Sequence, residues 1–131
     1  MAKDHKQEGE DFLAENAKQT DVYMTDSGLQ YTIIEDADGP KPGPTDVVVV
    51  NYRGAFIDNK TFDSSYDRGE PLSFPLNGVI AGWTEGLQLM SVGSRYKFYI
   101  PYHLAYGEEG YPGAIPPYST LIFDVELLEI R

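Results

Sequence analysis

A valine-rich segment over residues 46–56 constrains the fold of this chain more than any other feature. It holds four consecutive valines, Val47 to Val50, and ends in aromatic residues; β-branched and aromatic residues favour an extended backbone. The segment just before it, residues 38–44, contains three prolines and two glycines, which exclude a helix or an internal strand there. We therefore expect an irregular loop followed by a strand.

Three further segments alternate apolar and polar residues with the period of a strand, namely residues 29–33, 94–100 and 120–130. In the first of these, Leu29, Tyr31 and Ile33 are the expected buried positions. Four strands separated by loops and a single short helix are typical of an antiparallel sheet.

One short amphipathic helix is expected after the turn at Asn77-Gly78. The apolar residues Ile80, Trp83, Leu87 and Met90 recur there at three- and four-residue spacing. The fold class that follows is α+β, with a curved antiparallel β-sheet wrapped around this helix. A second loop, residues 106–117, contains three glycines and three prolines, and long irregular loops often carry function.

Residues 3–18 predict an N-terminal helical extension. They are polar and acidic, with a thin apolar stripe of Phe12, Leu13, Ala14 and Ala17. A frayed, solvated helix is the alternative interpretation. Because the segment is so polar, we expect it to bury little against the rest of the chain. The chain then divides into a helical linker or tail, 1–24, and a folded domain, 25–131.

Charge and composition exclude several classes of function. A net charge of -11 with only 10 Lys and Arg argues against nucleic-acid binding. The chain has no cysteine, which excludes disulfides, thiolate metal sites and cysteine nucleophiles. The histidines, His5 and His103, have no nearby ligand partners, so no metal is expected. No cofactor-binding motif occurs either, so none is expected.

A hydrolase and a membrane protein are also disfavoured. No Gly-x-Ser-x-Gly motif occurs, and Ser64-Ser65 has no local base. The longest aliphatic run is Val47 to Val50, far short of the ~20 residues that a membrane-spanning helix needs. The first residues lack the apolar core of a signal peptide, so we expect none in the chain as printed.

Aromatic residues gather in segments that also hold turn residues. They make up 13% of the chain and include 10 tyrosines. Each aromatic taken singly is better interpreted as part of the core. Tyr106-Gly107 and Tyr111-Pro112-Gly113, however, lie in the second loop, where exposed rings are costly without a use. The pattern as a whole favours a functional site.

Five blocks of sequence, taken in order, resemble the FK506-binding protein family. They are KTFDSS (60–65), VIAGWTEGL (79–87), AYG (105–107), IPP (115–117) and LIFDVELL (121–128). The resemblance covers about residues 28–131. It implies an FK506-binding-type isomerase domain that catalyses rotation of X–Pro peptide bonds and assists protein folding.

The N-terminal segments carry a finer resemblance. Residues 9–18 and 27–31 are similar to the linker and entry strand of the bacterial macrophage-infectivity-potentiator branch of the family. That branch implies export to the bacterial periplasm or cell surface, with the cytoplasm as the alternative. It also implies that a dimer forms only if a helical domain precedes this chain.

The family resemblance implies a desolvated aromatic pocket with Trp83 as its floor. The residues expected to be catalytic are Asp63, Trp83, Tyr106 and Phe123. The residues expected to bind substrate are Tyr52, Phe62, Leu72, Phe74, Val79, Ile80, Tyr111 and Ile115. Leu72 and Tyr111 stand where better-known members often have Phe and His, which leaves ligand affinity open. Asp63 has a second interpretation, a turn-capping carboxylate beside Ser64 and Ser65.

The implied partners are proline-containing polypeptides, with the macrolides FK506 and rapamycin as inhibitors. Rotation about an X–Pro amide interrupts resonance without breaking a bond to carbon, so no nucleophile is required. Catalysis then means binding the twisted amide better than the planar one. The alternative is a binding module, in which the same pocket holds proline-containing segments and turnover is incidental.

Overall fold

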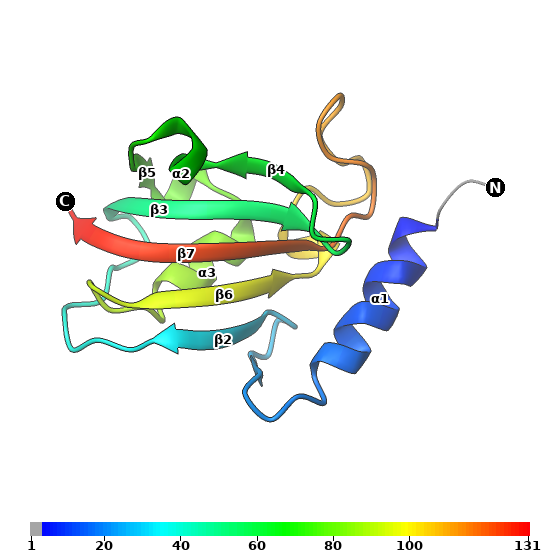
Figure 1. Cartoon of the computed structure of the whole chain (residues 1–131), viewed down its shortest axis with the longest axis horizontal. Coiled ribbons are helices and arrows are strands. Elements are labelled where there is room, and N and C mark those ends of the chain that lie inside the picture. Colours follow the sequence, from blue (N-terminus) through cyan, green and yellow to red (C-terminus); the bar gives the residue numbers. More distant parts are fainter. Residues whose placement is uncertain (1–3) are drawn as a thin grey trace.

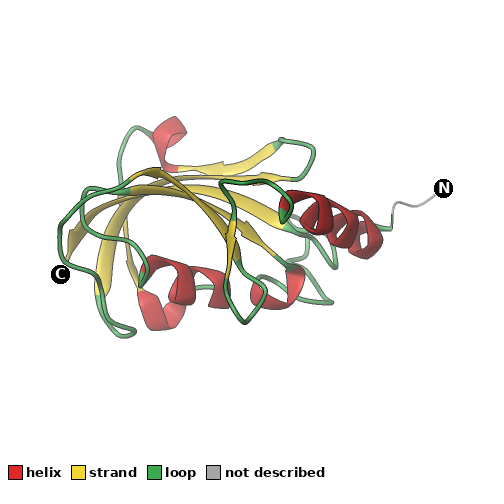
Figure 2. Cartoon of the chain, turned by 90° about the horizontal axis from the view of Figure 1, so that it is seen from below, coloured by secondary structure: helices red, strands yellow, loops and turns green. Residues whose placement is uncertain are grey.

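The structure is a computed structural model of the chain, and it describes residues 4–131. Residue 3, the expected start of the N-terminal helix, lies outside the described residues. Seven strands form one sheet in the order β1-β2-β6-β7-β3-β4, with β5 paired to β3. Every pairing is antiparallel. The sheet curves over α3, which lies on its concave side (Figures 1 and 2). The α+β class with a curved antiparallel sheet is confirmed.

The elements within residues 4–131 have the following bounds. The strands are β1 (Tyr23–Met24), β2 (Gln30–Glu35), β3 (Val47–Phe56), β4 (Thr61–Ser64), β5 (Leu72–Pro75), β6 (Arg95–Ile100) and β7 (Leu121–Ile130). The helices are α1 (His5–Asn16), α2 (Ser65–Arg68) and α3 (Ala81–Leu87), with 3-10 turns η1 (Leu76–Gly78) and η2 (Tyr102–Leu104).

The valine-rich segment forms β3, a central strand of the sheet. It pairs with β7 along its length, from Val48 opposite Ile130 to Phe56 opposite Leu121, and the register shifts between Val49 and Val50. A register shift of this kind bends a strand and increases its twist. The expected alternation is clear in β6 and in β7 as far as Leu127, where every second side chain is buried.

The core lies between the concave face of the sheet and α3. Its fully buried members include Leu29, Val50, Leu76, Leu87, Met90, Phe98, Ile100, Leu121, Val125 and Leu127. Two glycines of α3 let the helix backbone approach the sheet. A Cβ at Gly82 would lie 2.7 Å from Ile100 Cγ2, and a Cβ at Gly86 would lie 2.6 Å from Phe98 Cε1. This close packing holds Trp83 of the same helix against β3 and β7.

Four elements were not predicted from sequence patterns: β1, β4, β5 and α2. The strands among them have two to four residues, too few for a period to show. The single turn α2 adds a second short helix to the one expected. Ser64 Oγ accepts from Asp67 N at 3.3 Å at its start, and Gly69 ends it with φ 80°.

The predicted buried face of the first alternating segment is wrong in part. Leu29 is fully buried, but Ile33 is 37% exposed, while Gln30 and Thr32 on the opposite face are buried. The reason is α1, which covers that opposite face next to β2. The side-chain amide of Gln30 donates to Leu13 O at 3.0 Å.

The helix α1 confirms the expected helical extension but packs more closely than expected. Gly9 is buried, and the Phe12 ring lies 6.1 Å from that of Tyr99 of β6. Gly9 is the one buried residue of α1, so the expectation that this segment buries little holds for most of the helix, and the contacts of Gly9 and Phe12 are the exception. No helix within residues 4–131 combines the length and the apolar composition needed to cross a membrane.

Candidate active site

A cavity of about 410 Å³ opens beside α3 on the concave side of the sheet. This volume falls within the range of about 300–1,000 Å³ that is typical of small-ligand sites. It is lined by Tyr52, Phe62, Asp63, Phe74, Gly78, Val79, Ile80, Trp83, Tyr106 and Phe123. The lining comes from β3, β4, β5, β7, α3, η1 with the two residues after it, and the loop after η2.

Three rings of the cavity pack edge to face against Trp83. The indole lies 5.2 Å from the Tyr52 ring, 5.4 Å from Phe74 and 5.3 Å from Phe123, with interplanar angles of 84°, 81° and 84°. Edge-to-face pairs at such distances are favourable beyond the area they bury. Trp83 is only 5% exposed, and its Nε1 has no hydrogen-bond partner among the described residues. The indole is thus held in place by the surrounding rings, and its N–H is buried without a partner in the part of the chain that the structure describes.

Gly54 of β3 has no side chain, and this lets two aromatic rings pack against the strand and form one wall of the cavity. A Cβ at Gly54 would lie 2.7 Å from Phe123 Cε1 and 2.8 Å from Phe62 Cζ. The two rings themselves meet at 88° and 5.6 Å. Any other residue at Gly54 would displace one of them, so this glycine fixes the shape of the wall.

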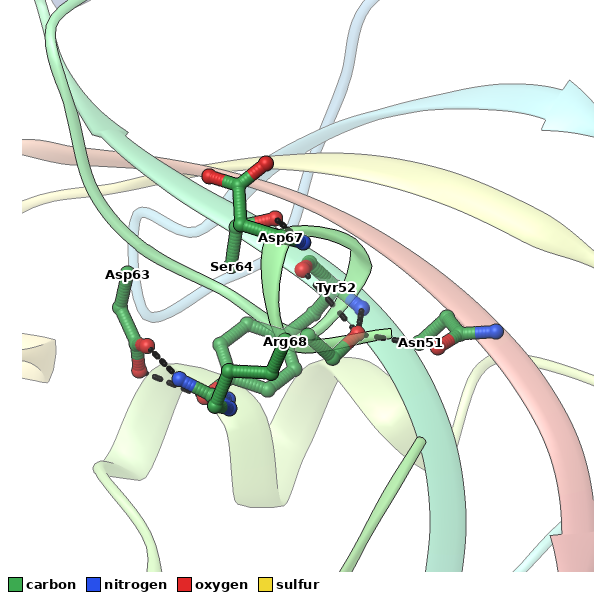
Figure 3. Close-up of polar contacts among 7 residues, drawn as sticks. Asn51, Tyr52, Asp63, Ser64, Asp67 and Arg68 are labelled. Carbon is green, nitrogen blue, oxygen red and sulfur yellow. Dashed lines mark hydrogen bonds and ion pairs between the residues drawn. The ribbon is translucent and has the colours of Figure 1, made fainter. Parts of the chain in front are cut away.

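One carboxylate borders the cavity, held by two neighbours (Figure 3). Tyr52 Oη donates to Asp63 Oδ2 at 2.5 Å, Arg68 Nη2 donates to Tyr52 Oη at 2.8 Å, and Arg68 Nη1 donates to Asp63 Oδ1. Burial alone raises the pKa of Asp63, but the hydrogen bonds from Tyr52 and Arg68 outweigh it and hold the pKa below its usual range. Asp63 is therefore ionised near neutral pH.

The turn-capping interpretation of Asp63 does not fit the geometry. The residue that caps α2 is Ser64, whose hydroxyl accepts from the backbone of Asp67. Ser65 Oγ accepts from Tyr52 N at 2.8 Å and donates to Asn51 Oδ1 at 3.0 Å. The two serines thus tie α2 to β3, and this attachment places Arg68 beside Asp63.

Besides the buried Trp83 Nε1, two polar groups at the cavity have no hydrogen-bond partner among the described residues. Within residues 4–131 the backbone N–H of Ile80 and the hydroxyl of Tyr106 make no hydrogen bond. Burial raises the pKa of Tyr106, and the nearby charge of Asp63 raises it further. The hydroxyl therefore stays protonated and able to donate across the neutral range. The cavity thus combines apolar rings with two free donors.

Nine of the twelve expected site residues line this cavity, and three do not. Leu72 pairs with Val50 in the sheet. Ile115 is buried and forms a backbone bridge with Tyr111. Tyr111 is 58% exposed, with its ring 5.9 Å from that of Tyr106. All three lie outside the lining, so their part in binding stays a prediction.

Sequence reasoning missed two residues of the site and had little signal for either. Gly78 lines the cavity, but a turn glycine gave no reason to expect a cavity contact. Arg68 lies five residues after Asp63, and only the turn of α2 brings its guanidinium back to that carboxylate. Within residues 4–131 no cluster of three or more potential metal-ligating side chains occurs.

The sequence of this chain matches two protein families, which cover different parts of it. Residues 39–128 match the FKBP-type peptidyl-prolyl cis-trans isomerase family. Residues 1–33 match the family described as the domain amino terminal to FKBP-type peptidyl-prolyl isomerase. The chain therefore belongs to the FKBP-type peptidyl-prolyl cis–trans isomerases.

Individual relatives place the chain more closely. The isomerase FkpA of Aeromonas hydrophila is 55% identical over 99% of this chain and 48% of the relative. The outer membrane protein MIP of Legionella longbeachae is 42% identical over 99% of this chain and 56% of the relative. The crystal structure of FkpA from Escherichia coli has a TM-score of 0.94 at 51% identity and covers 98% of this chain and 60% of that one. The chain thus spans about half the length of its curated relatives.

Proposed function

We propose that this chain catalyses cis–trans isomerisation of X–Pro bonds in polypeptides, with the proline ring seated against Trp83. The observation that carries the proposal is the set of three rings packed edge to face around Trp83, with free donors beside them. Proline is apolar and stiff, so a slot of fixed rings binds it with little ordering cost. The reaction proceeds without a cofactor or a covalent intermediate.

Desolvation favours the twisted amide in such a cavity. A planar X–Pro amide owes its barrier of ~18–20 kcal/mol to resonance that spreads charge over oxygen and nitrogen. The planar form is the more polar one and loses more when water is removed, whereas the twisted form loses less. An apolar cavity thus lowers the barrier by binding the two forms unequally.

The two free donors take the carbonyls of the substrate. The Ile80 N–H binds one carbonyl next to the proline, and the Tyr106 hydroxyl binds a second. Donors already in place cost no reorganisation during the rotation. Asp63 is an ionised carboxylate that holds the Tyr52 hydroxyl by a hydrogen bond and places a negative charge at the cavity. It transfers no proton. Tyr111, Leu72 and Ile115 support substrate binding from positions around the cavity.

The macrolides FK506 and rapamycin bind the same cavity and compete with proline peptides. Support comes from the family match and from the nine residues, among those that the family resemblance implies for the site, that line the cavity. Residues 1–24 form a linker and residues 25–131 the isomerase domain. We place the protein in the bacterial periplasm or at the cell surface, because one relative is an outer membrane protein; the cytoplasm is the alternative. A dimer requires a helical domain upstream of this chain.

A peptide assay separates an isomerase from a binding module. The full chain is mixed with a short X–Pro peptide, and cis–trans exchange is followed by NMR with and without saturating rapamycin. The proposal predicts exchange far faster than the uncatalysed tens to hundreds of seconds, abolished by rapamycin and by Trp83→Ala. Peptide binding that changes Trp83 fluorescence but leaves exchange at the uncatalysed rate would instead establish a binding module.

A further inference from the structure

The helix α1 contacts the loop that carries Tyr106, at the loop's far end from the cavity. This loop runs from η2 to β7, residues 102–120, and we call it the Tyr106 loop. Gly9 of α1 packs directly on Thr120, where a Cβ would lie 2.3 Å from Oγ1 and 3.1 Å from Cβ. Lys6 Nζ lies 5.6 Å from the centre of the Tyr118 ring. Figure 1 shows α1 beside the ends of β3 and β7, next to this loop.

The other half of α1 is anchored to the sheet. The buried side chain of Gln30 bonds the helix twice: its Nε2 donates to Leu13 O at 3.0 Å, and its Oε1 accepts from Asn16 Nδ2 at 2.9 Å. The Phe12 ring adds a contact with Tyr99. The helix therefore joins two parts of the domain, with its C-terminal half on β2 and β6 and its N-terminal half on the Tyr106 loop.

A short chain of backbone contacts leads from Tyr118 to Tyr106. Tyr118 N donates to Gly107 O at 3.0 Å, and Gly107 N donates to Tyr102 O at 2.9 Å. The Tyr102 and Tyr118 rings meet at 5.0 Å and 78°. Gly107 directly follows Tyr106, so the position of Tyr118 sets the backbone from which the Tyr106 hydroxyl is presented.

The backbone at Tyr118 needs external support. Its φ of 61° lies in the left-handed region, which a bulky residue adopts only when the surrounding structure imposes it. The loop itself supplies the bond to Gly107 and a bond from Ser119 Oγ to Pro116 O at 2.8 Å. The contacts of α1 with Tyr118 and Thr120 supply support on the remaining side.

We propose that α1 is a positioning element of the isomerase site, because its docking through Gly9 on Thr120 fixes the Tyr106 loop and hence the Tyr106 hydroxyl. The inference rests on the proposed function. It revises the expectation that the N-terminal segment has little to contribute to the domain. The similarity to Escherichia coli FkpA extends over 98% of this chain and therefore includes α1.

The substitution Gly9→Ala in the full chain tests the docking by the sign of its effect. In an unpacked helix this change is stabilising, since Ala is the better helix former. In the docked helix the new Cβ meets Thr120, so we expect Tm to fall by about 3–6 °C. The neighbouring change Glu10→Ala, at an exposed position of the same helix, is the control and should leave Tm and rate unchanged.

The coupling to Tyr106 is tested by kcat/KM on a short X–Pro peptide at a temperature where all variants are folded. Gly9→Ala should lower kcat/KM by roughly two- to fivefold, bounded by the loss of the whole Tyr106 hydroxyl bond. In a Tyr106→Phe background the same change should lower it no further. The double variant Gly9→Ala/Thr120→Ala, which removes Oγ1, should recover most of the rate. Hydrogen exchange at the Tyr118 amide should be faster in Gly9→Ala alone.

Three results would overturn the proposal. A raised Tm in Gly9→Ala would show that α1 is not docked. An unchanged rate, or equal rate losses in the wild-type and Tyr106→Phe backgrounds, would show that α1 does not act through Tyr106. A wild-type chain without isomerase activity would overturn the proposed function and this inference together, whereas the other two results leave the proposed function intact.

Discussion

Tyr106 and Asp63 are two of the polar side chains at the cavity, and they differ in how firmly they are held. Asp63 accepts hydrogen bonds from Tyr52 and Arg68, which fix both of its oxygens. Tyr106 has no partner within residues 4–131 and is 37% exposed. Asp63 is thus part of a closed hydrogen-bond network, whereas the Tyr106 hydroxyl is free to bind a ligand. This difference leads to separate predictions for the two residues.

Removing the Tyr106 hydroxyl should weaken catalysis modestly. One hydrogen bond contributes about 1 kcal/mol net, so Tyr106→Phe should lower kcat/KM about fivefold in a peptide isomerisation assay. Tyr23→Phe is the matched control, because Tyr23 lies on β1 away from the cavity and is 53% exposed. A loss a hundredfold or larger for Tyr106→Phe would mean that the hydroxyl does more than orient a carbonyl.

The ionised state of Asp63 should contribute to stability only above acidic pH. Its pKa is lower in the folded chain than the usual value. The contribution is therefore fully present above the unfolded pKa of ~4 and is lost as pH falls through the lower folded pKa. Because the pair with Arg68 is partly exposed, Asp63→Asn should cost no more than about 1 kcal/mol at pH 7. Urea unfolding at pH 7 and pH 2.5 measures this, and a difference that grows on acidification would contradict the assignment.

At the scale of elements, the contact of α3 with β6 places Trp83 in the site. Gly86 lies against the Phe98 ring with no room for a Cβ. Gly86→Ala should destabilise the fold by about 1–3 kcal/mol, measured by urea unfolding. Gly43→Ala is the control, since a Cβ there would meet only Asp46 Oδ2, at 3.6 Å. Equal stabilities of the two variants would show that α3 can move off the sheet without loss.

The long elements could be predicted from the sequence, and the short ones could not. The strands β6 and β7 and the helix α3 have clear periods, and β3 has a run of β-branched residues; the structure confirms all four elements. The elements β4, α2 and β5 depend on tertiary contacts, such as the bonds of Ser65 to Asn51 and Tyr52. Ile33 of β2 was predicted to be buried and is exposed. The alternation of apolar and polar residues shows that a strand has two different faces, but it does not show which other element covers each face.

The site itself was predictable through family resemblance rather than through periodicity. The resemblance named nine residues that line the cavity, among them Trp83 and Asp63. It gave no reason to expect Arg68 beside Asp63. The interpretation of each single aromatic residue as core is correct for Tyr52, Trp83 and Phe123, which are each at most 5% exposed, and wrong for Tyr106 and Tyr111, which are 37% and 58% exposed.

At the scale of the whole molecule, the cavity is continuous with the hydrophobic core, because the two share residues. Tyr52, Trp83 and Phe123 belong both to the buried core and to the cavity lining. The same curved sheet and α3 that stabilise the fold therefore also form the walls of the cavity. The proposed catalysis by desolvation relies on this arrangement, because close-packed rings limit the water that can reach a bound amide.

The central claim is that X–Pro rotation occurs in this cavity by desolvation and orientation, without proton transfer. The most direct test is kcat/KM for a short X–Pro peptide from pH 6 to pH 9, in light and heavy water. Asp63 has a lowered pKa, and Tyr52 and Tyr106 have raised ones, so none of these groups changes protonation in that range. We expect a flat profile and a solvent isotope effect near unity. A bell-shaped profile with a large isotope effect would show general acid–base catalysis and contradict the account.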